Sequence, residues 1–253
     1  MRLNTVTTIS CLVVLALPAA GSGPLQADEI VIDREGIVDA VASALEAQYV
    51  YPDISEQMAV HIRSALERGD YDELSSLSAF ANRLTMDLRE VSDDGHIIVY
   101  EFDPETATAT LADDLSEQDV TGHARDNFGF VKVERLPGNV GYVRFDSFDY
   151  VQIGGPTATA AMSFVANCDA VILDLRKNSG GKKGMVQFLA SYFFRESTHF
   201  LTFYDRDNRV LEQTWSLDYV PGKRMFDTPV YILMSRQTAS AAEAFSYNLS
   251  SAG

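Results

Sequence analysis

A serine near the end of the chain separates an apolar run from a string of small helix-forming residues. Residues 229–248 read PVYILMSRQTASAAEAFSYN, and Ser240 lies where the helical string begins. A helix start favours developing negative charge, so a serine there could attack a carbonyl carbon while nearby amides, including that of Ala241, hold the oxyanion. The alternative is that Ser240, or Thr238 before it, only caps the helix. Taken alone, the stretch favours capping.

A second polar turn follows a strongly apolar strand pattern. Residues 170–173 are apolar throughout, and residues 174–181 read DLRKNSGG. The α/β folds place ligand sites at such strand ends, and Gly180 and Gly181 would let the backbone approach a substrate closely. An ordinary strand-to-helix loop could have the same composition. A phosphate-binding loop is excluded, because Arg176 stands where its first glycine belongs.

One histidine lies in a setting suited to proton transfer. His96 follows the acidic turn Asp93-Asp94-Gly95, just before a strand pattern. Histidine titrates near neutral pH and can take the proton of a serine hydroxyl, although a solvated loop residue is the simpler interpretation of His96 alone. The histidines lack metal-ligand spacing, so we expect no metal and no other cofactor. They are His61, His96, His123 and His199.

Three helical patterns precede this histidine, within residues 35–92. They are separated by breakers at 51–53 and 69–70, and they predict a small N-terminal helical domain over residues 28–95. Their apolar faces are formed by Ile37, Val41 and Leu45, by Met58, Ile62 and Leu66, and by Phe80, Leu84, Leu88 and Val91. Residues 96–127 then predict one strand and an exposed acidic linker.

From Phe128 onward, strand-like and helical runs alternate. The strand-like runs are 128–133, 140–146, 170–175, 199–204 and 229–235, and the helical runs are 157–166, 184–194 and 240–250. This alternation predicts a core over residues 128–253 with a mixed sheet, because some neighbouring strands should be antiparallel. The predicted fold class is therefore α/β in the broad sense that includes α+β.

The first 27 residues have the layout of a secretory signal peptide. Arg2 precedes an apolar stretch too short to cross a bilayer, and Leu25-Gln26-Ala27 offers a cleavage point. Its removal changes the formal net charge from −16 to −17 and leaves Cys168 as the single cysteine. We therefore expect an exported protein, periplasmic or secreted, without disulfides. Its acidity argues against nucleic acid as a partner, and we expect no membrane insertion after cleavage.

Three segments together resemble one peptidase family. Asp94-Gly95-His96, LDLRKNSGG at 173–181 and TASAAEAF at 238–245 are similar to motifs of the serine peptidases that include tail-specific and C-terminal-processing proteases and the tricorn core protease. Over residues 30–253 the chain resembles most closely the branch of interphotoreceptor retinoid-binding protein. We expect no PDZ domain of the kind found in the processing proteases, because His96 and Gly138 are too close in the sequence to hold one.

The resemblance implies a site and a reaction. Ser240 matches the nucleophile, His96 the general base, and the backbone amides of Gly180, Gly181 and Ala241 the oxyanion hole. The implied chemistry is hydrolysis of a peptide or protein substrate through an acyl-enzyme. Because the family core continues beyond the position of Gly253, we expect a core that is incomplete at its C-terminus and a third catalytic residue outside this sequence.

Two other interpretations stay open. The retinoid-binding relatives imply that the protein could instead bind apolar ligands without catalysis, and an inactive fragment of a peptidase would have the same sequence. The presence of both Ser240 and His96 favours the enzyme. The sequence does not indicate the cleavage specificity or the oligomeric state.

Overall fold

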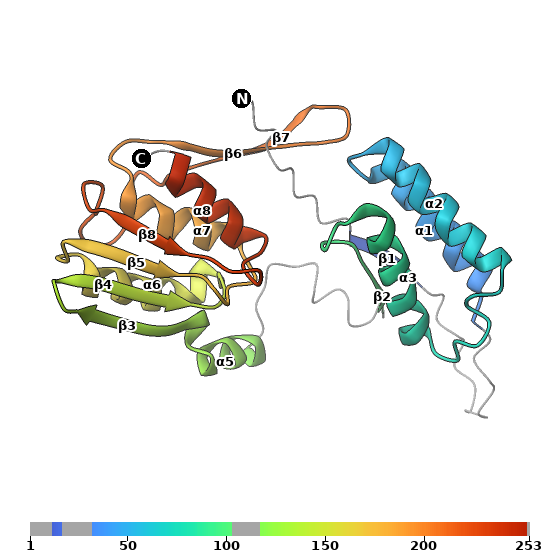
Figure 1. Cartoon of the computed structure of the whole chain (residues 1–253), viewed down its shortest axis with the longest axis horizontal. Coiled ribbons are helices and arrows are strands. Elements are labelled where there is room, and N and C mark those ends of the chain that lie inside the picture. Colours follow the sequence, from blue (N-terminus) through green and yellow to red (C-terminus); the bar gives the residue numbers. More distant parts are fainter. Residues whose placement is uncertain (1–11, 17–31, 103–116, 252–253) are drawn as a thin grey trace. The chain divides into compact units, whose positions relative to one another are not determined.

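The chain folds into two units, each with its own hydrophobic core. The computed structural model describes residues 12–16, 32–102 and 117–251 (Figure 1). Unit 1 comprises Met1–Asp114 and Phe203–Leu211, and unit 2 comprises Leu115–Thr202 and Glu212–Gly253. Most of the predicted signal peptide, and residues 103–116 of the predicted linker, lie outside the described residues.

Unit 1 contains the three predicted helices. They are α1 (Arg34–Gln48), α2 (Pro52–Glu67) and α3 (Leu77–Ser92). Polar caps begin two of them: Asp33 accepts a hydrogen bond from the N–H of Gly36, and Ser76 accepts one from the N–H of Ala79. The predicted apolar faces are buried against one another, except that Leu66 and Val91 are only partly buried. The 3.6-residue period therefore located this core correctly.

A strand follows the helices of unit 1. Strand β2 (Ile98–Phe102) pairs in parallel with β1 (Leu12–Ala16), in a register that joins Leu12 to Ile98. Residues 12–16 belong to the segment for which the sequence predicts a signal peptide, and no strand was predicted there. Export of the protein stays a prediction.

Unit 2 is built on the predicted mixed sheet. Its four strands lie in the order β3-β4-β5-β8, with β3 and β4 antiparallel and the other two pairs parallel. Their bounds are β3 (Phe130–Leu136), β4 (Val140–Phe145), β5 (Ala170–Asp174) and β8 (Val230–Leu233). The parallel strands β4, β5 and β8 therefore end at one common edge of the sheet.

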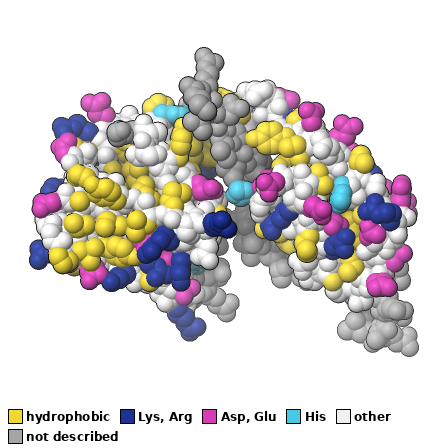
Figure 2. All heavy atoms as spheres, viewed as in Figure 1, with side chains coloured by type: hydrophobic (Ala, Val, Ile, Leu, Met, Phe, Trp, Pro, Cys, Tyr) yellow, Lys and Arg dark blue, Asp and Glu magenta, His cyan; other side chains and the backbone are white. Residues whose placement is uncertain are grey.

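Three helices lie beside the sheet of unit 2 in Figure 1: α6 (Val151–Val165), α7 (Lys183–Ala190) and α8 (Ala241–Ser251). Their apolar side chains contribute to the core of this unit. Alternate residues of the strands, such as Val143 and Leu173, are buried in this core. The opposite face carries a row of paired residues, Tyr142, Ile172 and Tyr231. Tyr231 is exposed, and apolar side chains gather on the face of this unit seen in Figure 2.

Several predicted boundaries were wrong. Helix α5 (Glu117–Arg125) lies in the predicted linker. Helix α6 begins six residues before the predicted residue 157, and Gly154, Gly155 and Pro156 lie inside it. A side chain at Gly154 would come within 3.0 Å of Cβ of Phe128, so close packing explains that glycine. The other elements are 3-10 helices η1 (Asn127–Gly129) and η2 (Ser191–Phe193), and the hairpin of β6 (His199–Tyr204) and the unpredicted β7 (Val210–Trp215).

None of the helices in the described part of the chain has both the length and the apolar character needed to span a membrane.

Candidate active site

Ser240 immediately precedes α8 and has an unusual backbone conformation. Its φ angle is +54°, in the left-handed region that non-glycine residues seldom adopt. Its N–H donates to Oε2 of Glu243 at 2.7 Å, and its carbonyl accepts from the N–H of Glu243 at 3.0 Å. Within the described part of the chain its hydroxyl makes no hydrogen bond. Ser240 therefore occupies the cap position by its backbone, while its hydroxyl is left for other chemistry.

Thr238, the other capping candidate, has a different task. Its Oγ1 donates to the carbonyl of Leu175 at 2.8 Å and accepts from the N–H of Ser235 at 2.9 Å. The hydroxyl of Ser235 in turn donates to the carbonyl of Arg176 at 2.5 Å. These bonds fasten the turn before Ser240 to the segment that follows β5, so the two motifs lie side by side.

Asn178 holds three segments of the site together. Its side chain is fully buried; Nδ2 donates to the carbonyl of Phe145 at 3.0 Å, and Oδ1 accepts from the N–H of Gly180 at 2.9 Å. Its own carbonyl accepts from the N–H of Ala239 at 3.2 Å. Because Ala239 directly precedes Ser240, Asn178 fixes the serine relative to the glycine turn. The sequence had indicated no separate role for Asn178, although a polar residue inside a Gly-rich motif is a signal for one.

The two glycines are required by close contacts. Gly180 and Gly181 have φ angles of +109° and +135°. A Cβ at Gly180 would stand 2.9 Å from Cβ of Ser240, and one at Gly181 would stand 2.1 Å from the carbonyl oxygen of Phe148. Phe148 also donates from its N–H to the carbonyl of Gly180 at 2.8 Å. The turn therefore lies directly against Ser240 on one side and Phe148 on the other.

The amides of the predicted oxyanion hole are not equivalent. The N–H of Gly180 is already bonded to Asn178. In the described part of the chain, no hydrogen bond uses the N–H of Gly181 or of Ala241, and the Ala241 nitrogen would be 3.1 Å from a Cβ at Gly180. Gly181 and Ala241 thus have donors free for an oxyanion, whereas Gly180 provides the close approach to Ser240.

Three aromatic rings support this region from within the core. Phe145, Phe148 and Phe245 are each exposed by at most 1%. The ring centroids of Phe145 and Phe148 are 5.1 Å apart, and those of Phe148 and Phe245 are 5.2 Å apart. Because these rings come from the end of β4, the loop after it and α8, they attach the helix that directly follows Ser240 to the sheet.

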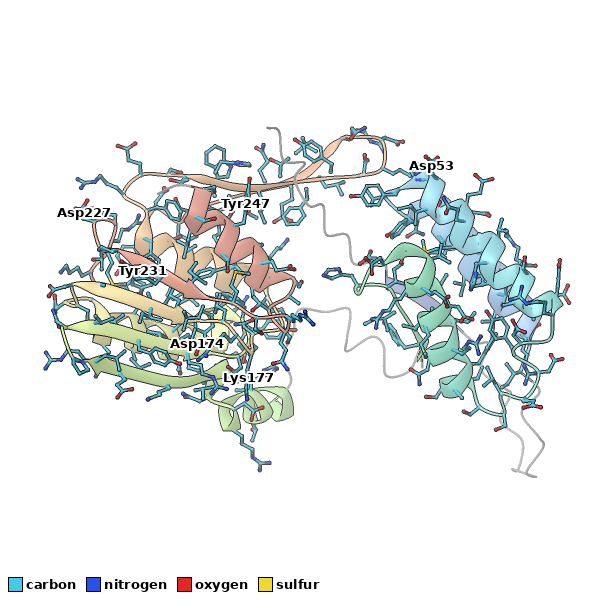
Figure 3. The ribbon with its side chains drawn as sticks, viewed as in Figure 1. Asp53, Asp174, Lys177, Asp227, Tyr231 and Tyr247 are labelled. Carbon is cyan, nitrogen blue, oxygen red and sulfur yellow. The ribbon has the colours of Figure 1, made fainter. Side chains whose placement is uncertain are left out.

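The last residue of β5, Asp174, has a buried carboxylate. Asp174 accepts hydrogen bonds from Nε of Arg176 at 2.9 Å and from the hydroxyl of Tyr142 at 2.5 Å. Figure 3 labels both Asp174 and Lys177 near this end of the strand. The hydrogen bond from Arg176, supported by that from Tyr142, holds the pKa of Asp174 well below its usual range. Burial raises the pKa of Tyr142. Asp174 is thus a structural anion and a poor proton acceptor.

The structure brings four of the five predicted site residues together in unit 2: Ser240, Gly180, Gly181 and Ala241. The fifth, His96, belongs to unit 1. His96 lies in the turn after α3, and its Nδ1 is 2.9 Å from Oδ1 of Asp94. Unit 2 contains a second pair of this kind, His123 and Asp149, with Nδ1 and Oδ2 separated by 2.9 Å. The sequence had indicated no role for His123.

One group of side chains could be considered for a metal. His61, Asp87 and Glu90, on α2 and α3, each have a ligand atom within 4.8 Å of the others. The oxygens of Asp87 already accept hydrogen bonds from Tyr71 and Arg83, at 2.8 Å each. We therefore interpret Asp87 as part of a structural ion pair and assign no metal to this group.

Known proteins match both units. The profile of peptidase family S41 matches residues 139–253, and that of the N-terminal domain of peptidase S41 in eukaryotic IRBP, the interphotoreceptor retinoid-binding protein, matches residues 30–125.

Similar solved structures include the photosystem II D1 C-terminal processing protease, with 14% identity, a TM-score of 0.49 and coverage of 88% of this chain and 79% of that one. A Parabacteroides merdae protein provisionally named a peptidase has 18% identity, a TM-score of 0.49 and coverage of 84% and 70%. A lipoprotein from Streptococcus agalactiae has 15% identity, a TM-score of 0.47 and coverage of 89% and 75%. On the two profile matches, the chain belongs to peptidase family S41 and carries the IRBP-type N-terminal domain.

Proposed function

We propose that this protein is a serine peptidase that cleaves peptide bonds through an acyl-enzyme, with Ser240 as nucleophile and His96 as general base. The observation that carries the proposal is the conformation of Ser240. A left-handed, non-glycine residue costs free energy, and such strain is retained where the surrounding structure fixes it. Here Asn178 and the glycine turn fix the serine, while its hydroxyl has no partner in the described part of the chain.

The reaction begins when Oγ of Ser240 attacks the carbonyl carbon of the scissile peptide bond. Its proton passes to Nε2 of His96 as the C–O bond forms. The free N–H groups of Gly181 and Ala241 then donate hydrogen bonds to the oxyanion, which the positive end of α8 also stabilises. When the C–N bond breaks, Nε2 returns the proton to the leaving amine. A water molecule then gives a proton to Nε2 of His96 and attacks the acyl carbon. The bond between that carbon and Oγ of Ser240 breaks, the carboxylic acid product leaves, and the proton passes from Nε2 back to Oγ.

The proposal assigns a modified role to Gly180. The family resemblance implies that its amide donates to the oxyanion, but that amide is bonded to Asn178. In the proposed mechanism, Gly180 makes room for Ser240 and for the nitrogen of Ala241, both of which a side chain at this position would crowd. Two donors, from Gly181 and Ala241, are sufficient for an oxyanion hole.

The proposed substrates are peptides or proteins that this peptidase meets outside the cytoplasm. Export rests on the apolar N-terminal segment and its cleavage point after Ala27. With a formal net charge of −17 after removal of the first 27 residues, the surface would favour neutral or basic substrates over acidic ones.

The test is hydrolysis of a mixture of unstructured peptides, followed by mass spectrometry. We compare the full chain with Ser240→Ala, His96→Asn and the control Ser250→Ala, which removes an exposed hydroxyl from the same helix. Cleavage by the unsubstituted protein and the control, with losses of about 1,000-fold or more in the other two, is expected. The proposal would be contradicted if Ser240→Ala cleaved the peptides as fast as the unsubstituted protein, or if no folded form cleaved any peptide. Binding of an apolar ligand without hydrolysis would indicate the non-catalytic alternative.

A further inference from the structure

We infer that Asp94 is the carboxylate that positions His96 for its proposed role as general base. The inference rests on the proposed function, because it assumes that His96 exchanges the proton of Ser240. It offers a residue in the described part of the chain for the role that the family resemblance places beyond Gly253. Asp94 acts through His96 and is therefore a positioning residue.

The contacts of Asp94 select one form of the imidazole ring. Its Oδ1 is 2.9 Å from Nδ1 of His96 and also accepts the backbone N–H of His96 at 2.9 Å. An ionised carboxylate can only accept hydrogen bonds, so Nδ1 of a neutral His96 must carry the proton. Nε2 is then unprotonated and can take the proton of a serine hydroxyl. When it does so, Asp94 faces a positively charged imidazolium and stabilises it.

Other residues hold Asp94 in place. The hydroxyl of Tyr49, a residue only 3% exposed, donates to Oδ2 of Asp94 at 3.1 Å. The backbone N–H of Asp94 donates to Oγ of Ser92 at 3.2 Å. The carboxylate is thus held through both oxygens and through its own backbone, as required of a group that must orient a second side chain.

The turn is also clamped on either side of the histidine. Arg89 donates from Nη2 to the carbonyl of Gly95 at 2.7 Å and from Nε to that of Ile97 at 2.8 Å. Among the described residues, the charged and titratable groups with hydrogen bonds to this turn include Asp94, Tyr49 and Arg89. The side chain of His96 remains 33% exposed, so the ring is held firmly without being buried.

A purely structural role for Asp94 makes a different prediction. A side chain that only closes the turn needs its bond to the backbone N–H of His96 and gains nothing from Nδ1. Asparagine can make the same backbone bond. Replacement by asparagine would then leave the chemistry of His96 unchanged, whereas a positioning role requires the charge.

The experiment measures the rate at which a fluorophosphonate probe inactivates the full-length protein between pH 5 and pH 9. We expect Asp94→Asn to slow the reaction by about 100-fold or more at pH 7, and Asp94→Glu, which restores a carboxylate, to recover part of the loss. The matched control is Asp93→Asn. It removes the same charge from an exposed residue of the same turn, at a φ of +51° that asparagine tolerates, and should stay within twofold.

The tautomer of His96 gives a second readout on the unsubstituted protein. Nitrogen NMR of histidine-labelled protein, assigned with His96→Asn, should show the Nδ1–H form at high pH and its loss in Asp94→Asn. An Nε2–H form in the unsubstituted protein would overturn the inference even if Asp94→Asn did not fold. Equal rates for Asp94→Asn and Asp93→Asn would also overturn it.

These outcomes differ from a failure of the proposed function. If the probe does not label Ser240, or if His96→Asn reacts at the unsubstituted rate, the nucleophile and base themselves are wrong. His123→Asn tests the other histidine–carboxylate pair. Loss of reactivity in that variant, but not in His96→Asn, would transfer the base to His123 and remove Asp94 from the mechanism.

Discussion

Gly180→Ala tests whether the glycine turn is shaped by its contact with Ser240. The added methyl carbon would stand 2.9 Å from Cβ of Ser240 and 3.1 Å from the nitrogen of Ala241. Non-bonded carbon atoms prefer about 3.5–4.0 Å, so Ser240 or the turn must move by about 0.6 Å or more. A displacement of about 1 Å costs about 100-fold in rate, and we therefore expect kcat/KM to fall by about tenfold to 100-fold.

The same substitution also strains the backbone. Alanine at a φ of +109° costs about 1–3 kcal/mol, and crowding adds to this, so the free energy of unfolding should fall by about 2–4 kcal/mol. Gly138→Ala is the matched control: its φ is +80°, and a Cβ there meets nothing within 4 Å. It should lose about 1 kcal/mol and no activity.

Urea denaturation and initial rates on one cleaved peptide measure both effects. If Gly180→Ala retains full activity, or if Gly138→Ala loses as much activity as Gly180→Ala, the proposed contact between the turn and the serine does not govern the reaction.

Three further predictions concern the groups around the site. Asn178→Ala should lower the free energy of unfolding by about 2–4 kcal/mol in urea denaturation, because the N–H of Gly180 and the carbonyl of Phe145 lose their partner. A loss below about 1 kcal/mol would contradict the proposal that Asn178 holds these segments together. Asp174 has a folded-state pKa below its ordinary value of 3.8, so its ionised form stabilises the fold at neutral pH and this contribution is lost as the pH falls from about 5 towards 2. Asp174→Asn should therefore be less stable than the unsubstituted protein at pH 7 in urea denaturation, with a smaller difference at pH 2.5; a constant difference would refute the assignment. Glu243→Ala should lower the free energy of unfolding by about 0.5–2 kcal/mol in thermal denaturation, since the N–H of Ser240 loses its acceptor, and an unchanged melting temperature would speak against that bond.

The arrangement of secondary structure was largely predictable from local patterns. The helical faces containing Leu45, Ile62 and Leu84 repeat every three or four residues, and these side chains are fully buried. The apolar run at 170–173 is a central strand, as its lack of polar residues indicated. Helix α6 was placed too late because Gly154, Gly155 and Pro156 disfavour helix locally, and packing against Phe128 outweighs that preference.

The site was less predictable, because its geometry depends on contacts between distant segments. Family resemblance indicated Ser240, but the composition of its segment favoured capping. The left-handed φ angle of Ser240 and the cap provided by Glu243 appear only in the folded chain. The role of Asn178 depends on contacts with Phe145 and Ala239, which no local pattern encodes.

The most direct test of the central claim is to map the adduct of a fluorophosphonate on the full-length protein by peptide mass spectrometry. The proposed mechanism predicts a single modified residue, Ser240, no adduct in Ser240→Ala, and a rate reduced by about 1,000-fold or more in His96→Asn. An adduct on another serine, or a His96→Asn variant that reacts as fast as the unsubstituted protein, would contradict it.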